Sequence, residues 1–224
     1  MIPVKDENPT SITPLLTWLL IGLNIGVFIW EVTDGVEHFN TIVASYGLIP
    51  ASVLNKGEYL TLITSIFLHG GWLHLVGNML YLYIFGDNVE DMCGHLHYLL
   101  FYLICGISAS AAHIFAEPGS EIPAVGASGA ISGVLGAYVV LFPKVRIKTA
   151  VTLGWFIHFV SIPAYILVGT WFIYQFLLAT LGLEVGVAYW AHVGGFIAGV
   201  VLGRAFASRK RYHPMYKDRT YWRR

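Results

Sequence analysis

Ser128 is the first residue whose type and setting could do chemistry. It lies in the frame Gly126-Ala127-Ser128-Gly129, which opens an apolar stretch rich in small residues. A serine at the start of a helix combines a nucleophilic hydroxyl with backbone N–H groups that have no intrahelical partner. The frame alone is unspecific, because glycine and serine are common where membrane helices pack closely. A hydrolase hypothesis therefore needs its other parts at the same depth.

Three further side chains could supply those parts: His74, Asn78 and His192. His74 and Asn78 are one helical turn apart and share a face. His192 could accept the Ser128 proton as general base and later donate it to the leaving amine. The side chains of His74 and Asn78, with the Ser128 N–H, could stabilise an oxyanion. Each has a structural alternative: His192 as an interfacial histidine, and the other two as hydrogen-bonding residues that hold helices together.

The elements that carry these residues are predicted to cross a membrane. The 224 residues are 56% hydrophobic and 12% charged, whereas soluble domains carry about 25% charged residues. Several apolar runs approach or exceed the ~20 residues that span a bilayer. We predict an all-α membrane protein: a segment 1–12, a six-helix bundle 13–207 and a basic tail 208–224. The helices are expected at about 14–30, 71–86, 96–115, 128–142, 163–181 and 187–207.

Two segments do not fit a simple span. The stretch 149–181 is too long for one helix, and Pro163 divides it. We expect 149–162 to be an interfacial or re-entrant piece. The long connection 31–68 is expected to lie on or in the interface, and loops of this length are often functional. Cys93 and Cys105 fit neither a disulfide framework nor a metal cluster.

Basic residues predict the orientation. One side of the bundle receives Lys5, Lys144, Arg146, Lys148, Arg204 and the tail, and the other side receives only Lys56. The positive-inside rule then makes both termini cytoplasmic in a multi-pass protein of the cell membrane. Ser128, His74, Asn78 and His192 all fall in the outer half of the membrane, where buried polar groups usually mark a site or a polar cavity. The net charge of zero gives no indication of nucleic-acid binding.

Small residues predict that the helices bearing Ser128 and His192 approach closely. Ala191, Gly195, Gly199 and Gly203 recur at four-residue spacing, opposite Gly129 and Gly133. Such seams allow two backbones to come near each other, as a bond between a serine and an imidazole requires. No Asp or Glu lies inside either helix. The expected site is therefore a dyad, with His192 oriented by packing or by a backbone group.

Taken together, these motifs resemble those of the rhomboid intramembrane serine proteases over nearly the whole chain. The matches are His74-x-x-x-Asn78, Gly126-x-Ser128-Gly129 and Ala191-His192-x-x-Gly195, each on the expected helix. The six-helix form is similar to bacterial and archaeal members. The resemblance implies an endopeptidase that cuts transmembrane segments of other proteins near their outer end, within the lipid bilayer and without metal or cofactor.

The resemblance also implies roles for individual residues. Ser128 is the nucleophile and His192 the general base, and His74, Asn78 and the Ser128 backbone form the oxyanion site. His69 matches a family histidine before the second helix, and Gly126, Gly129 and Ser132 are further candidates for supporting the site.

Two positions depart from the family pattern. A Trp-Arg pair that many members carry in the first loop is replaced by Leu60-Thr61. Some members have a tyrosine one turn after the nucleophile, against which the catalytic imidazole stacks, and here Ser132 takes that place. This chain is thus expected to differ from other members in the contacts that hold the first loop in place and in the orientation of His192.

Other functions remain as alternatives. A proteolytically inactive rhomboid-like protein that binds membrane clients is disfavoured, because the serine, both histidines and the asparagine are intact. A transporter would explain the broken stretch at Pro163, but the sequence shows no internal repeat and no paired acids in the spans. A zinc site from His69, His74 and His192 lacks both a carboxylate ligand and the His-Glu-x-x-His pattern. An aspartyl protease is disfavoured because no Asp lies within a predicted span.

Overall fold

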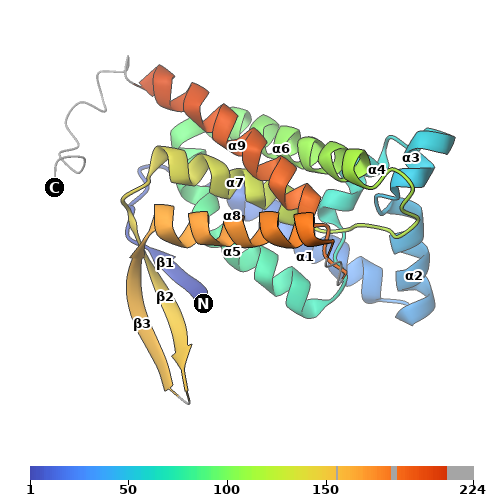
Figure 1. Ribbon diagram of the computed structural model, residues 1–224, viewed down its shortest axis with the longest axis horizontal. Coiled ribbons are helices and arrows are strands. Elements are labelled where there is room, and N and C mark those ends of the chain that lie inside the picture. Colours follow the sequence, from blue (N-terminus) through green and yellow to red (C-terminus); the bar gives the residue numbers. More distant parts are fainter. Residues whose placement is uncertain (155, 183–185, 211–224) are drawn as a thin grey trace.

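A bundle of long helices forms the body of the protein (Figure 1). The computed structural model describes residues 1–154, 156–182 and 186–210. The central helix of the bundle is α7, whose residues are nearly all buried among its neighbours. The long helices are α1 (Leu15–Val32), α5 (Trp72–Cys93), α6 (His95–Ala116), α7 (Ser128–Leu141), α8 (Ala164–Leu181) and α9 (Tyr189–Lys210).

Four of these helices are long and apolar enough to cross a membrane: α1, α6, α8 and most of α9. The chain is accordingly a multi-pass membrane protein. The other two differ from this group. Helix α7 is apolar but has 14 residues, and α5 carries Asp87, Glu90 and Asp91 near its end. The number of six spans therefore stays a prediction. The expected helix bounds agree with the structure to within about three residues, except that α5 continues to Cys93, beyond its expected end at 86. The predicted basic tail from residue 211 onward lies outside the described residues.

A buried carboxylate explains where α1 begins. Glu90 of α5 accepts hydrogen bonds from the Leu16 and Thr17 N–H groups at 2.9 and 2.8 Å, and from the Thr17 hydroxyl at 2.7 Å. The N–H groups of a first helical turn lack intrahelical partners and favour negative charge. Glu90 thus satisfies the start of α1 and ties it to α5.

The long first connection folds into short helices. They are α2 (Gly35–Tyr46), α3 (Pro50–Lys56), α4 (Thr61–Thr64) and the 3₁₀ turn η1 (Ser65–Phe67). This segment hydrogen-bonds to the strand-like stretch before α7: Leu48 and Ala124 exchange backbone bonds, and the Gly126 N–H donates to the Ser65 carbonyl. The connection therefore holds the residues that lead into Ser128.

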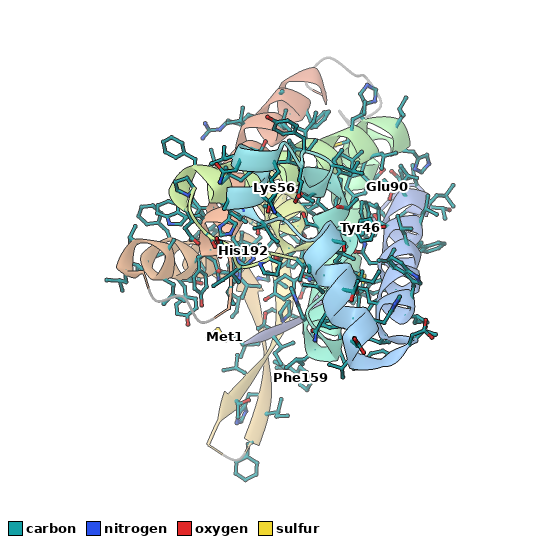
Figure 2. The ribbon with its side chains drawn as sticks, turned by 90° about the vertical axis from the view of Figure 1, so that its right-hand side faces the viewer. Met1, Tyr46, Lys56, Glu90, Phe159 and His192 are labelled. Carbon is teal, nitrogen blue, oxygen red and sulfur yellow. The ribbon has the colours of Figure 1, made fainter. Side chains whose placement is uncertain are left out.

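A three-stranded antiparallel sheet corrects the all-α prediction. It contains β1 (Ile2–Asp6), β2 (Arg146–Leu153) and β3 (Phe156–Pro163), in the order β1-β2-β3. The stretch 149–162 is thus mostly a β-hairpin, which the sequence did not predict, and its interfacial or re-entrant placement stays a prediction. Alternating β-branched residues favour a strand here, since Ile147 and Thr149 bury one face of β2 against the bundle. The hairpin projects away from the helices, as Phe159 marks in Figure 2.

The predicted close approach of α7 and α9 is confirmed. A Cβ added to Gly195 would collide with the Gly129 carbonyl oxygen, and one added to Gly199 would collide with the Gly133 carbonyl oxygen. Gly203 meets Ala137 in the same way one turn further on. The two backbones are therefore in direct contact along several turns, which is the packing that small residues permit between membrane helices.

Candidate active site

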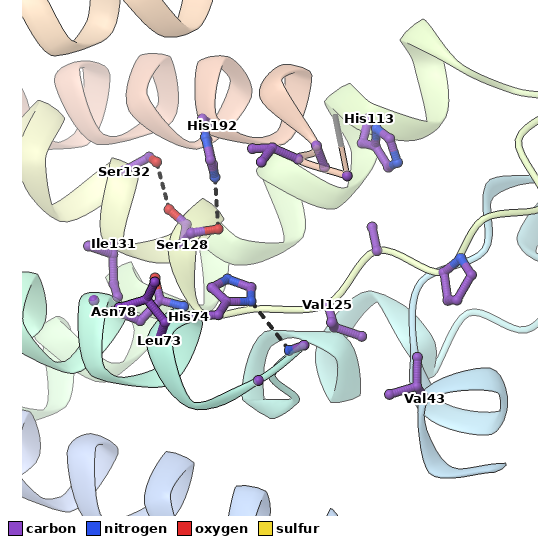
Figure 3. A pocket seen from close by; sticks show the side chains of 18 of the residues that line it. Val43, Leu73, His74, Asn78, His113, Val125, Ser128, Ile131, Ser132 and His192 are labelled. Atoms are coloured by element: carbon purple, nitrogen blue, oxygen red, sulfur yellow. Dashed lines mark hydrogen bonds between the residues drawn. The ribbon is translucent and has the colours of Figure 1, made fainter. Parts of the chain in front are cut away.

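Ser128 and His192 face each other across the α7–α9 seam. Ser128 is the first residue of α7, and His192 lies in the first turn of α9. The Ser128 Oγ and the His192 Nε2 are 2.8 Å apart, which is hydrogen-bond distance (Figure 3). The two residues are sixty-four positions apart in the chain, and the glycine seam brings them together.

A side chain of α8 completes the environment of His192. The Oε1 of Gln175 lies 2.7 Å from the His192 Nδ1, and both residues are buried. The sequence predicted that packing or a backbone group orients the imidazole, and the structure adds a side-chain amide that was not predicted. The orienting group is an amide on a third helix, whereas the sequence argument concerned acidic residues on the helices of Ser128 and His192. The available signal was a single glutamine within the apolar helix α8.

Two aromatic rings border the imidazole in place of the family tyrosine. Trp171 of α8 lies tilted against His192 with ring centroids 5.9 Å apart, and Tyr189 meets it edge-on at 6.4 Å. Ser132 is turned away from the histidine, because its hydroxyl donates to the Ser128 carbonyl at 2.6 Å. The role that stacking on a tyrosine has in other members is thus taken by groups from α8 and the start of α9.

Helix α5 presents two polar groups to Ser128 from the other side (Figure 3). The His74 Nδ1 accepts a hydrogen bond from the Gly70 N–H at 3.3 Å. This bond leaves Nε2 to carry the proton, so His74 is a donor on its far side. The Asn78 Nδ2 is buried and has no hydrogen-bond partner among the described residues. A buried donor without a partner is costly unless another molecule accepts from it.

Gly126 is required where the chain passes between Ser128 and His74. Its φ of +133° is one that L-residues with a side chain rarely adopt, and an added Cβ would lie 2.8 Å from the His74 ring. Gly129 permits a different contact, since its added Cβ would strike the Ala109 side chain of α6. Both glycines therefore support the site through close packing.

His69 lies behind His74 and outside the cavity wall. Its backbone N–H donates to the carboxylate of Glu31 at 3.1 and 3.2 Å. Its ring meets the His74 ring edge-on, with the centroids 5.3 Å apart. Burial, with a smaller contribution from nearby His74, lowers the pKa of His69 to about 4. His69 is therefore neutral at physiological pH and is placed to support His74 by packing.

A cavity of about 1050 Å³ joins these groups. Ser128, His192, His74 and Asn78 all line it, together with Ser132 and Trp171. Its rim includes Leu73 and Ile122, whose side chains are 86% and 68% exposed, so the cavity reaches the molecular surface. All four residues predicted to do the chemistry thus meet at one space that a peptide segment and water could enter.

Comparison with known proteins identifies the family. The Rhomboid domain matches residues 56–209, which include Ser128, His192, His74 and Asn78. The chain belongs to the rhomboid family. Rhomboids are generally intramembrane serine proteases, and some members are inactive.

Named relatives of this rhomboid include bacterial and plant proteins. It is 42% identical over 131 residues to rhomboid protease GluP of Bacillus subtilis, covering 57% of this chain and 25% of that protein. It is 35% identical over 123 residues to the putative rhomboid protease YdcA of the same species, covering 54% and 55%. Identity to RHOMBOID-like protein 5 of Arabidopsis thaliana is 32% over 170 residues, covering 74% and 50%. The matches thus span from a quarter to about half of these relatives.

Proposed function

We propose that this rhomboid is an intramembrane serine endopeptidase in which Ser128 is the nucleophile and His192 the general base. The observation that carries the proposal is the 2.8 Å approach of Ser128 Oγ to His192 Nε2 at the wall of a cavity. A nucleophile within hydrogen-bond reach of a base, with that base held by a third group, is the arrangement that activates a serine hydroxyl.

The reaction follows from the direction of each hydrogen bond. His192 Nε2 takes the Ser128 proton as Oγ bonds to the carbonyl carbon of the substrate. The resulting oxyanion is stabilised by the Ser128 N–H, the His74 Nε2–H and the Asn78 amide, which are donors preorganised on α7 and α5. His192 then gives the proton to the leaving nitrogen as the peptide bond breaks. Water, activated by the same imidazole, hydrolyses the Ser128 ester.

The orientation follows from where the basic residues lie. Lys5 of β1 and Lys148 of β2 pair within the sheet, at the end of the bundle opposite α3 with its Lys56 (Figure 1). We place the sheet in the cytoplasm and the site in the outer half of a cell membrane. Substrates are then transmembrane segments cut near their outer end. Because a helix satisfies its own backbone, such a segment must unwind locally, which Gly or Pro would favour.

Cleavage of a model transmembrane substrate in liposomes tests the proposal. Ser128→Ala should lower turnover by at least about 10⁴-fold, because the nucleophile is removed. Wild-type Ser128 should also react with a fluorophosphonate, and His192→Ala should abolish that labelling. Ser132→Ala is the matched control, since it deletes a hydroxyl one turn away and should leave labelling intact. Cleavage that survives in Ser128→Ala contradicts the proposal, and a wild-type protein without cleavage or labelling would be an inactive rhomboid-like protein.

A further inference from the structure

Helix α8 contributes few buried residues to the bundle, and one of them is polar. Ala164, Val168 and Gln175 are its buried positions, spread along one face. Seven of the other α8 side chains are large apolar groups exposed at the surface, which suits lipid contact. An amide in an apolar helix is costly unless it is hydrogen-bonded, so a buried Gln175 calls for a specific partner. That partner is the Nδ1 of His192 at 2.7 Å.

The direction of this bond matters for the imidazole. A neutral imidazole has one N–H and one lone pair, and the bond made by one nitrogen decides the state of the other. The Gln175 Oε1 can only accept, so it requires the proton on Nδ1. Nε2 then has its lone pair toward the Ser128 hydroxyl, as a general base needs. With the other tautomer, Nε2 would be a donor and could not take the serine proton.

We propose that Gln175 is a positioning residue, which selects the working tautomer and the ring orientation of His192 from a third helix. The inference rests on the proposed function and refines it. An amide does this without adding a charge to an apolar region, where an unpaired carboxylate would be expensive. Because the amide is on α8, the tautomer and orientation of His192 depend on the position of a helix that contributes neither Ser128 nor His192.

The test compares three variants of the full-length protein in liposomes. Gln175→Met keeps an unbranched side chain of similar size but removes the strong acceptor. The His192 Nδ1–H is then buried without a partner, and kcat should fall by about 10- to 100-fold with KM little changed. Gln175→Glu keeps an acceptor oxygen at the same reach and should retain most of kcat. Val168→Ala loosens the same buried face two turns away and should leave kcat near the wild-type value.

A second measurement separates chemistry from substrate entry. The rate of fluorophosphonate labelling of Ser128 needs the base but no unwound transmembrane segment. Labelling should slow in Gln175→Met in proportion to kcat. Wild-type kcat in Gln175→Met overturns the inference, as does an equal loss in Val168→Ala or in Gln175→Glu. These results concern Gln175 alone, whereas cleavage unaffected by Ser128→Ala would overturn the proposed function itself.

Discussion

Helices α7 and α8 both pack against α9, and they do so by different means. Between α7 and α9 the backbones touch, with Gly195 against Gly129 and Gly199 against Gly133. Between α8 and α9 the contact is made by side chains, above all by the Phe172 and Phe196 rings, which stack at 4.2 Å. Backbone contact leaves little room for adjustment, whereas aromatic side chains can move between rotamers.

This difference separates two tasks at the site. The distance from Ser128 to His192 is fixed by the backbone contact of α7 and α9. The Nδ1 side of His192, with Gln175 and Trp171, is formed by the helix that is mostly exposed. In the proposed mechanism, the bond-forming atoms are thus on the tightly packed part, and the groups that orient the base are on the part with fewer buried contacts. Changes in the first part should cost more than changes in the second.

After the loss of Ser128 itself, the largest effect on turnover is expected at Asn78, which faces Ser128 from α5. Asn78→Ala removes a buried donor that has no other partner among the described residues. If the amide binds the oxyanion, turnover should fall by about 10²–10³-fold, which exceeds the loss expected at Gln175. Steady-state cleavage in liposomes measures it, with Val76→Ala, an exposed position on the same helix, as control. Unchanged turnover would assign Asn78 a structural role.

The same substitution in both regions tests the contrast in packing. Gly199→Ala places a methyl group into the Gly133 carbonyl, while Gly169→Ala on α8 meets nothing within 4 Å. We expect Gly199→Ala to lower the free energy of unfolding by about 3 kcal/mol or more and to reduce cleavage, because neither backbone can yield. Gly169→Ala should be neutral or slightly stabilising. Reversible unfolding in mixed micelles measures both, and similar losses would show that the two interfaces are alike.

The features that were predictable from sequence are those fixed by local pattern. Apolar length located the long helices, and glycine spacing indicated the α7–α9 contact before any coordinates. The four residues of the site could be grouped because three helices enter from one side. Their meeting at one cavity follows from that order.

The features that were missed depend on contacts between distant segments. Strand β2 pairs locally with β3 but also with β1 near the N-terminus, so the third strand of the sheet could not be read from 149–162 alone. Gln175 is one amide among apolar residues, and nothing near it in sequence indicates a histidine seventeen positions later. Glu31 falls at the start of the predicted connection 31–68, yet it is buried in α1 and accepts a hydrogen bond from the His69 backbone N–H. Tertiary packing decided each of these positions.

The smallest effect is expected at the far end of α5 and α7, where β1 is anchored. Asp6 accepts hydrogen bonds from the Tyr138 hydroxyl at 2.7 Å and the Asn88 amide at 2.9 Å. Burial raises the pKa of Asp6 to about 6 from 3.8, against the opposing effect of the Tyr138 bond. The folded state therefore binds this proton more tightly than the unfolded state. The contribution of protonated Asp6 to the free energy of unfolding is complete below about pH 4 and is lost as the pH rises through about 6.

Unfolding at a series of pH values between 4 and 7.5 measures this contribution. The wild-type protein should lose at most about 3 kcal/mol over that range on account of Asp6, and less if water reaches the carboxyl. Asp6→Asn, which keeps the size but cannot ionise, should remove this part of the pH dependence. The dyad lies at the other end of α7, so cleavage relative to the folded fraction should be the same in Asp6→Asn and wild type. If the pH dependence of the free energy of unfolding persists in Asp6→Asn, it arises from other titratable groups and not from Asp6.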